Sequence, residues 1–214
     1  MTTKEDYTGI QIFAEELPSF LPAPAGIHVA RCVSFFQLGT QKTEFEGKSG
    51  KDRPKIMLEF EIPGEQIYFI RNTYTLIISD KSTLKLHVES WTKGKINKEF
   101  DFFTLLGKPC QVEVEQNQNK NDATKMDSKL IGIYPLEKDQ ECPPQVTPSK
   151  VLVFQRWDQE TFESLPDWMQ KEIEKSPEFK SMGLPMVAGN KEGVFNEKEN
   201  PVDPYPIGAD GLPF

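Results

Sequence analysis

The feature that most constrains the fold is a pair of β-forming segments, residues 27–38 and 55–62, joined by a charged loop. The first is rich in β-branched and aromatic residues and lacks helical spacing. The second alternates, with four apolar residues on one face: Ile56, Leu58, Phe60 and Ile62. Lys55, Glu59 and Glu61 fall on the opposite face, which we expect to be solvated. The pair predicts two strands around a long polar loop, residues 41–54, and loops of this length are typically functional or disordered.

Three further strands and one helix are expected to follow. Residues 67–78 are dense in β-formers and predict a third strand. Ser79 or Asp80 is a candidate N-cap for a helix whose apolar positions repeat at i, i+4 and i+7 and which ends at Gly94; these positions are Leu84, Val88 and Trp91. Residues 110–115 and 129–134 predict the fourth and fifth strands.

Five short strands with one helix between the third and the fourth is the order of the OB-fold, a partly open, five-stranded Greek-key barrel. A small β-sandwich would give the same order, so both architectures remain open at this stage. We therefore predict a mainly β protein. The expected divisions are an extended N-terminal segment (1–25), the OB-fold domain (26–136), a linker (137–150), a C-terminal strand and helix extension (151–186), and a disordered acidic tail (187–214).

Residue types that carry catalysis are sparse. His28 and His87 are the only histidines, and neither has an evident catalytic partner in the sequence. No phosphate-binding glycine loop and no metal-ligand spacing are present. The cysteines, Cys32, Cys110 and Cys142, are an odd number without paired spacing, which fits a reducing compartment and inert thiols. We predict a protein without enzymatic activity, metal or cofactor.

The charge is unevenly distributed along the chain. The net charge of -8 divides into -3 for residues 1–30, +3 for 31–108 and -8 for 109–214. A basic body with an acidic tail is typical of proteins that bind nucleic acid, although ordinary surfaces also reach +3. Binding of single strands needs cations for phosphates and aromatic rings for bases. The candidates are Lys48, Lys51, Arg53, Lys55, Arg71, Tyr74, Trp91, Lys93 and Lys95, with core packing as the alternative for Tyr74 and Trp91 and an ordinary solvated surface as the alternative for the lysines.

The C-terminal third supplies two further candidate surfaces. The short helix expected near Ser164 has too few residues of its own to bury its apolar set, so it must pack on the barrel or on another copy of the chain. The candidate self-association residues are Trp157, Phe162, Leu165, Trp168 and Ile173. In the tail, a partner with a hydrophobic pocket rimmed by Arg or Lys would take the aromatic end and its carboxylate together. The candidate partner-binding residues are Asp210, Leu212, Pro213 and Phe214.

The chain resembles bacteriophage single-stranded DNA-binding proteins. The closing Leu212-Pro213-Phe214 is similar to the Ile-Pro-Phe end of the bacterial members, although Asp210 is the only acidic residue among the last seven. The body is similar through Leu38–Thr40, Tyr74–Leu76, Lys81–Ser82, Phe102–Lys108 and Leu165–Trp168. The resemblance implies an OB-fold, sequence-tolerant binding of single strands in replication and recombination, self-association, and recruitment of partner proteins by the tail.

Two functions therefore remain in view. The first is binding and protection of single-stranded DNA by a homo-oligomer, a dimer being favoured, in phage replication or recombination. The second is a protein-interaction adaptor that uses an OB-like barrel without nucleic acid. No apolar run is long enough to cross a membrane, and residues 1–10 lack the apolar core of a signal peptide. A cytoplasmic location is expected, in the host cell if the protein is phage-encoded.

Overall fold

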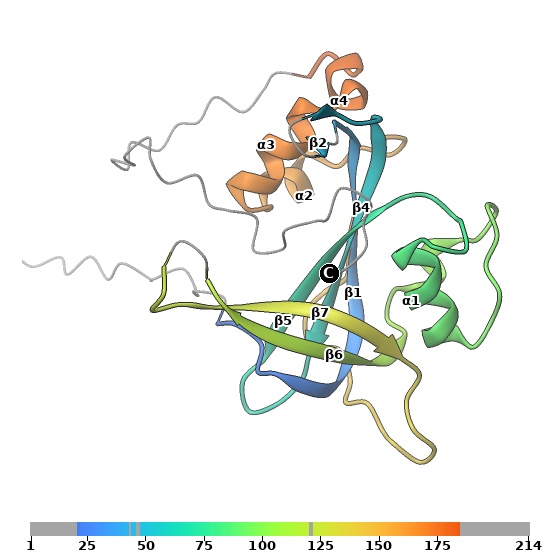
Figure 1. The fold of residues 1–214 in the computed structure, drawn as a ribbon, viewed down its shortest axis with the longest axis vertical. Helices are drawn as coiled ribbons and strands as arrows, with labels where there is room; N and C mark the ends of the chain where they lie inside the picture. Colours follow the sequence, from blue (N-terminus) through green and yellow to red (C-terminus); the bar gives the residue numbers. More distant parts are fainter. Residues whose placement is uncertain (1–20, 43, 46–47, 120–121, 185–214) are drawn as a thin grey trace, which may run out of the picture.

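A six-stranded sheet forms the body of the protein. The structure, a computed structural model, describes residues 21–42, 44–45, 48–119 and 122–184, with only the backbone described at 44–45 and 48–49. Five strands follow one another in the order β5-β4-β1-β6-β7, all antiparallel, and β8 adds to β1 in parallel (Figure 1). Their bounds are β1 (Gly26–Gln41), β4 (Arg53–Ile62), β5 (Tyr68–Thr75), β6 (Pro109–Gln118), β7 (Met126–Tyr134) and β8 (Lys150–Leu152).

The long strand β1 organises this sheet. Its first part, from Gly26 to Arg31, pairs with β6, and its second part, from Arg31 to Gln41, pairs with β4. The edge of β1 beyond β6 is taken by β8 at residues 34–36. Register shifts between Cys32 and Ser34 and between Gln37 and Gly39 interrupt the β4 ladder, and such bulges bend a strand. One strand thus pairs with three neighbours, β4, β6 and β8.

The inner face of the sheet holds the larger core. Ile56, Leu58 and Phe60 on β4 pack there with Ile70 on β5, all fully buried or nearly so. Helix α1 (Thr83–Thr92) covers this face with one apolar stripe, Leu84, Val88 and Trp91. Ser82 caps the helix by accepting the Lys85 N–H at 3.3 Å. The 3₁₀ helix η1 (Phe102–Leu105) adds Leu105 to the same core.

The outer face of β1 and β4 carries a second core, built with the C-terminal extension. Helices α2 (Gln159–Glu163), α3 (Asp167–Lys175) and α4 (Pro177–Ser181) lie on the opposite side of the β1–β4 pair from α1 (Figure 1). This core joins residues of the sheet to residues of the extension: Phe36, Leu38, Met57, Leu152, Phe162, Leu165, Met169, Ile173 and Phe179. The single helix expected from near Ser164 to just before Ser176 corresponds to α3, and the structure adds α2 before it and α4 after it.

Several expectations are changed by the structure. The sheet is not closed, so a barrel is not established; the end strands β5 and β7 contact each other without forming a described ladder. Within the loop expected at 41–54, β2 (Glu44–Phe45) and β3 (Lys48–Ser49) pair as a short hairpin. The third strand ends at Thr75, before the apolar residues 76–78. The helix begins later than expected, because Ser82 rather than Ser79 or Asp80 is its N-cap, and Lys93 in the left-handed region ends it ahead of Gly94.

The expectation of a solvated outer face on β4 is wrong. Glu59 is 6% exposed and Glu61 is 1% exposed. Glu61 accepts the backbone N–H groups of Val146 (2.9 Å) and Thr147 (2.7 Å), which belong to the segment leading into β8. Burial opposes ionisation of Glu61, but these hydrogen bonds hold its pKa below the usual value. Apolar and charged residues do alternate along β4, but another segment of the same chain covers the charged face.

Candidate nucleic-acid interface

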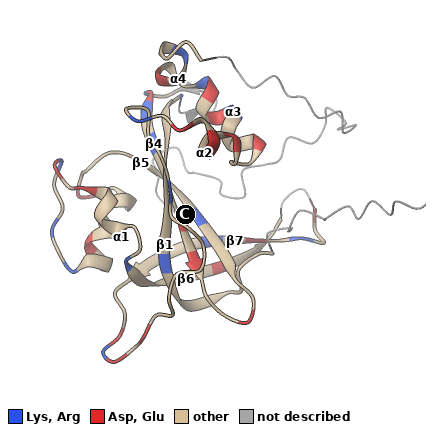
Figure 2. Ribbon diagram, turned by 180° about the vertical axis from the view of Figure 1, so that it is seen from behind, with Lys and Arg blue, Asp and Glu red and all other residues tan. Residues whose placement is uncertain are grey.

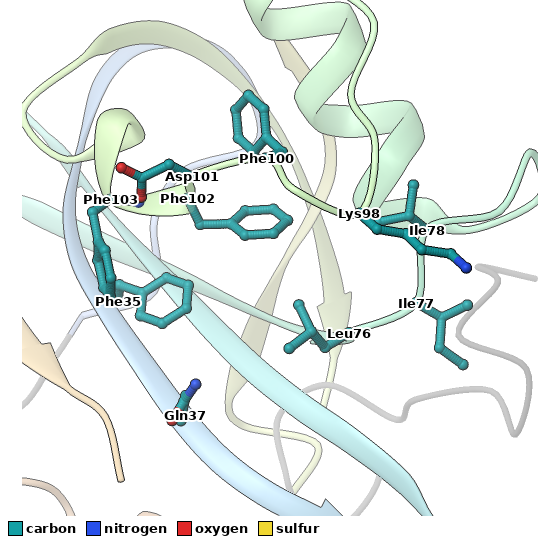
Figure 3. Close-up of a pocket in the computed structure, with 10 residues that line it drawn as sticks. All are labelled: Phe35, Gln37, Leu76, Ile77, Ile78, Lys98, Phe100, Asp101, Phe102 and Phe103. Atoms are coloured by element: carbon teal, nitrogen blue, oxygen red, sulfur yellow. The ribbon is translucent and has the colours of Figure 1, made fainter. Parts of the chain in front are cut away.

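A cleft lies at one end of the inner face, and we call it the phenylalanine cleft. Its volume is about 510 Å³. The lining comes from β1, from the segment after β5 and from the region of η1, and consists of Phe35, Gln37, Leu76, Ile77, Ile78, Lys98, Phe100, Asp101, Phe102 and Phe103. Figure 3 shows the phenylalanine rings gathered on one side and the aliphatic residues 76–78 with Lys98 on the other.

The rings form a connected cluster rather than isolated contacts. Phe35 meets Phe103 edge to face at a centroid distance of 5.2 Å and stacks on Phe102 at 6.4 Å. Phe100 in turn meets Phe102 edge to face at 5.1 Å. Phe103 remains 46% exposed, which leaves ring surface open at the cleft. Such a cluster is preorganised, because each ring is held by another.

Two local structures hold the walls in place. After β5 ends, the Leu76 N–H donates to the Pro54 carbonyl at 2.7 Å, which turns residues 76–78 toward the cleft. On the other wall, the Asp101 side chain accepts the Phe103 N–H at 2.9 Å, and the Thr104 hydroxyl donates to the Asp101 carbonyl at 2.6 Å. Asp101 is thereby engaged as the cap of η1.

The loop after α1 brings cations to this part of the molecule. Lys98 lines the cleft, while Lys93 and Lys95 precede it in the same loop, and all three are exposed. Lys95 lies 3.9 Å from Glu89, a distance at which a surface ion pair is weak. Figure 2 shows basic and acidic positions interspersed along the ribbon of the described residues. The cleft thus combines exposed ring surface with the ammonium group of Lys98. The ionisable groups in its lining are Lys98 and Asp101.

Two of the rings expected to bind bases are part of the core. Tyr74 and Trp91 are each 3% exposed. The Tyr74 hydroxyl is hydrogen-bonded to His87 Nδ1 at 2.9 Å, and burial raises the pKa of Tyr74 well above its usual value. The Trp91 indole N–H donates to the Pro109 carbonyl at 2.8 Å, and its ring packs edge to face on Phe60. Neither ring has a face free to stack on a base. Both residues therefore belong to the core, which was the alternative left open by the sequence.

The expected cations fall in separate places. Lys51, Arg53 and Lys55 lie at the start of β4, where β1 and β4 run beside α4 (Figure 1). Arg71 lies on the outer face, ion-paired with the buried carboxylate of Glu59, which also accepts the Ser34 hydroxyl at 3.0 Å. Lys93 and Lys95 lie in the loop after α1 that also carries Lys98, and the side chain of Lys48 lies outside the described residues. The cations of the set whose side chains are described therefore lie on three different elements: the approach and start of β4, β5, and the loop after α1.

The candidate self-association residues pack within their own chain. Phe162 and Ile173 are fully buried and Leu165 is 6% exposed, while Trp157 and Trp168 are half-buried against the same outer core. Of the two possibilities left open by the sequence, the extension lies on the sheet. The partner-binding residues Asp210, Leu212, Pro213 and Phe214 lie outside the described residues.

Sequence reasoning missed the phenylalanines of the cleft. Residues 100–106 read as one apolar patch, and nothing in the pattern says that Phe103 keeps an exposed face. The available signal was Asp101, an N-cap residue inside that patch, because a capped short helix cannot bury every side chain around its axis.

Other classes of site find little support in the part of the chain that the structure describes. No group of three or more His, Cys, Asp or Glu side chains is arranged to hold a metal ion there. Burial raises the pKa of the Cys32 thiol to about 12, and Cys110 is buried beside it with its pKa raised as well. None of the described helices is long and apolar enough to span a membrane. Searches against known protein families and curated proteins found no match for this chain.

Proposed function

We propose that the protein binds single-stranded DNA without strong sequence preference, with unstacked bases entering the phenylalanine cleft and phosphates meeting the lysines of the loop after α1. The observation that carries this proposal is the cluster of held phenylalanine rings, one of them 46% exposed, with Lys98 in the same lining. Base stacking on such rings is tolerant of sequence because every base has a flat face.

The topology supports the same proposal. The strand order β5-β4-β1-β6-β7, with α1 between the third and fourth of these strands along the chain, is compatible with an OB-fold and supports proposing one. The contact between β5 and β7 is the approach that a partly open barrel would have. Many OB-folds bind oligonucleotides, so the topology raises the expectation, while the cleft supplies the chemistry.

The first test is fluorescence anisotropy of a labelled oligo-dT at low salt. Phe103→Ala is expected to weaken binding by about 5- to 150-fold, since stacking of one base is worth roughly 1–3 kcal/mol. Met126→Ala is the matched control, because Met126 is 44% exposed but lies on β7, outside the cleft lining. Absence of any anisotropy change with the wild-type protein at low salt would refute the proposal.

A second arm tests the lysines. The triple variant Lys93→Ala/Lys95→Ala/Lys98→Ala is expected to reduce the slope of log K against log salt by about 2, because each phosphate contact to a single strand contributes about 0.7. The control triple variant Lys171→Ala/Lys175→Ala/Lys180→Ala removes three charges from α3 and α4. Equal changes in the two triple variants would mean that binding depends on overall charge rather than on this loop.

A protein-interaction adaptor is the second candidate, favoured by the apolar character of the cleft. Its lining is mostly Phe, Leu and Ile, and such a surface would also hold apolar side chains of a peptide. Under this alternative, Phe103→Ala abolishes capture of a protein partner in nuclease-treated extract, and no oligonucleotide shifts the anisotropy. The absence of enzymatic activity, tail-mediated recruitment of replication proteins and self-association all stay predictions.

A further inference from the structure

A second cleft, which we call the outer cleft, lies between the outer face of β4–β5 and the C-terminal helices. Its volume is about 320 Å³. Apolar side chains of both elements form much of it, among them Phe36, Ile67, Phe69, Leu165 and Met169. Arg71, Glu59 and Lys150 add charge, and the Lys150 ammonium donates to the Ser164 hydroxyl at 3.2 Å. The cleft therefore suits an apolar segment with nearby acidic groups.

The chain just before β1 is fixed in a way that leads into this cleft. Ala23 is fully buried, and its carbonyl accepts hydrogen bonds from Gln116 Nε2 at 2.9 Å and from the Ser128 hydroxyl at 2.6 Å. Two residues earlier, Leu21 is one of the lining residues of the outer cleft and is still 50% exposed. The anchored Ala23 thus holds Leu21 at the cleft.

We propose that the segment before Leu21, residues 12–20 of this same chain, docks in the outer cleft. This segment carries apolar residues at short intervals: Ile12, Phe13, Leu17 and Phe20. Phe20 is directly bonded to a lining residue, and Leu17 is four residues from Leu21, a reach of at most about 14 Å. No long connection has to be closed, so the entropic cost of docking is small.

Charge favours the same occupant. Glu15 and Glu16 lie between the apolar residues of the segment, while Lys150 on the cleft lining donates to a neutral hydroxyl. A second copy of the chain could offer the same residues, but only at the entropic cost of association. Docking would cover the outer side of β5 beside Arg71, a face that OB-folds often use for ligands, and would direct nucleic acid to the phenylalanine cleft.

Hydrogen exchange of the full-length chain tests this without any nucleic acid, so its result does not depend on the proposed function. The double variant Leu17→Asp/Phe20→Asp places charge in the docking segment. We expect amides in residues 66–71 and 164–169 to exchange at least about tenfold faster than in the wild type, because water gains access to the cleft. Thr2→Asp/Thr3→Asp adds the same charge nearer the N-terminus, outside the docking segment, and should leave the exchange rates of these amides unchanged. Equal exchange in the wild type and the Leu17→Asp/Phe20→Asp variant would overturn the proposal.

Photo-crosslinking from a benzophenone side chain at position 20 identifies the occupant directly. Docking within the chain gives crosslinks to residues 66–71 or 164–169 in a product of monomer mass. A product of dimer mass would overturn the proposal in favour of exchange between copies. Crosslinks confined to residues outside the outer cleft would overturn it as well.

Discussion

The two faces of the β1–β4 pair are packed by different means. On the inner face, the strands meet helix α1, which follows β5 in the chain, and the apolar alternation of β4 is matched by the stripe of α1. On the outer face, the covering residues come from the last third of the described chain, and they bury two carboxylates as well as apolar side chains. The inner face is closed mainly by apolar packing, with hydrogen bonds from the buried Tyr74 and Trp91, whereas the outer face also has to satisfy buried carboxylates.

This difference shows why Glu59 and Glu61 were misleading. Charged residues at alternate positions of a strand indicate a face that avoids an ordinary apolar core. They do not indicate whether water or another part of the chain satisfies them. Here Ser34 and Arg71 satisfy Glu59, and the backbone at 146–147 satisfies Glu61. The outer face is thus the surface on which the C-terminal extension of the same chain packs.

The largest expected effect comes from breaking the outer core. Phe162 is fully buried and packs against Trp157 at 5.0 Å and Phe179 at 5.5 Å. Phe162→Ala should lower the free energy of unfolding by about 3–5 kcal/mol, as for other buried phenylalanines. Because both cores share β1 and β4, urea unfolding should remain one transition by circular dichroism and by tryptophan fluorescence. Two separated transitions would show instead that the extension unfolds alone and that the two faces are independent.

A titration probes the inner face. Burial lowers the pKa of His87 from 6.5 to about 4, and the ring is hydrogen-bonded to Tyr74. The unfolded chain therefore takes up this proton at a higher pH than the native protein, and stability falls as the pH drops from about 6.5 to 4. The loss is on the order of 3 kcal/mol. Chemical denaturation across this range should show a weaker pH dependence for His87→Gln than for wild type, while His28→Gln keeps it; equal slopes for all three would contradict the assignment.

The carboxylate of Glu61 gives the corresponding test of the outer face. Glu61→Gln should cost about 2 kcal/mol at neutral pH, because two backbone N–H groups lose a charged acceptor. The native pKa of Glu61 is lowered, so its contribution is present above pH 4.5 and disappears as the pH falls through the native value. The difference in unfolding free energy between variant and wild type should shrink accordingly. Glu65→Gln, at an exposed position in the following turn, should show no such difference.

Much of the sheet could be predicted from the sequence because its signals are local. The alternation of 55–62 and the i, i+4, i+7 stripe of α1 each involve neighbouring residues, and the strand β4 and the buried stripe of α1 contain the residues that these patterns name. Strand ends were less predictable. Thr75 ends β5 although Leu76, Ile77 and Ile78 are strong β-formers, because those side chains line the phenylalanine cleft instead.

The candidate site was harder to predict from the sequence, because it depends on which side chains remain exposed to solvent. Tyr74 and Trp91 look like stacking residues in the sequence, but their polar atoms have partners inside the fold. Phe103 looks like core, yet nearly half of it is exposed. Lys51 and Lys55, four residues apart in the sequence, lie on β4 and its approach, whereas Lys93 and Lys95 lie in the loop after α1; whether such groups meet in one site depends on tertiary packing, which the sequence pattern does not give.

The smallest expected effect concerns the junction between α4 and the last residues of β1. Glu178 on α4 accepts the Thr40 N–H at 2.9 Å and the Thr40 hydroxyl at 2.6 Å, and Ser176 packs so closely on Gly39 that an added Cβ would lie 2.3 Å from its side chain. Thr40→Val removes the hydroxyl bond and keeps the backbone bond, so we expect a loss of about 1 kcal/mol. Measured in a double-mutant cycle with Glu178→Gln, the two losses should fall short of additivity by a similar amount. Full additivity would mean that α4 rests on β1 by packing alone, and that the outer face needs no hydrogen bonds at this end.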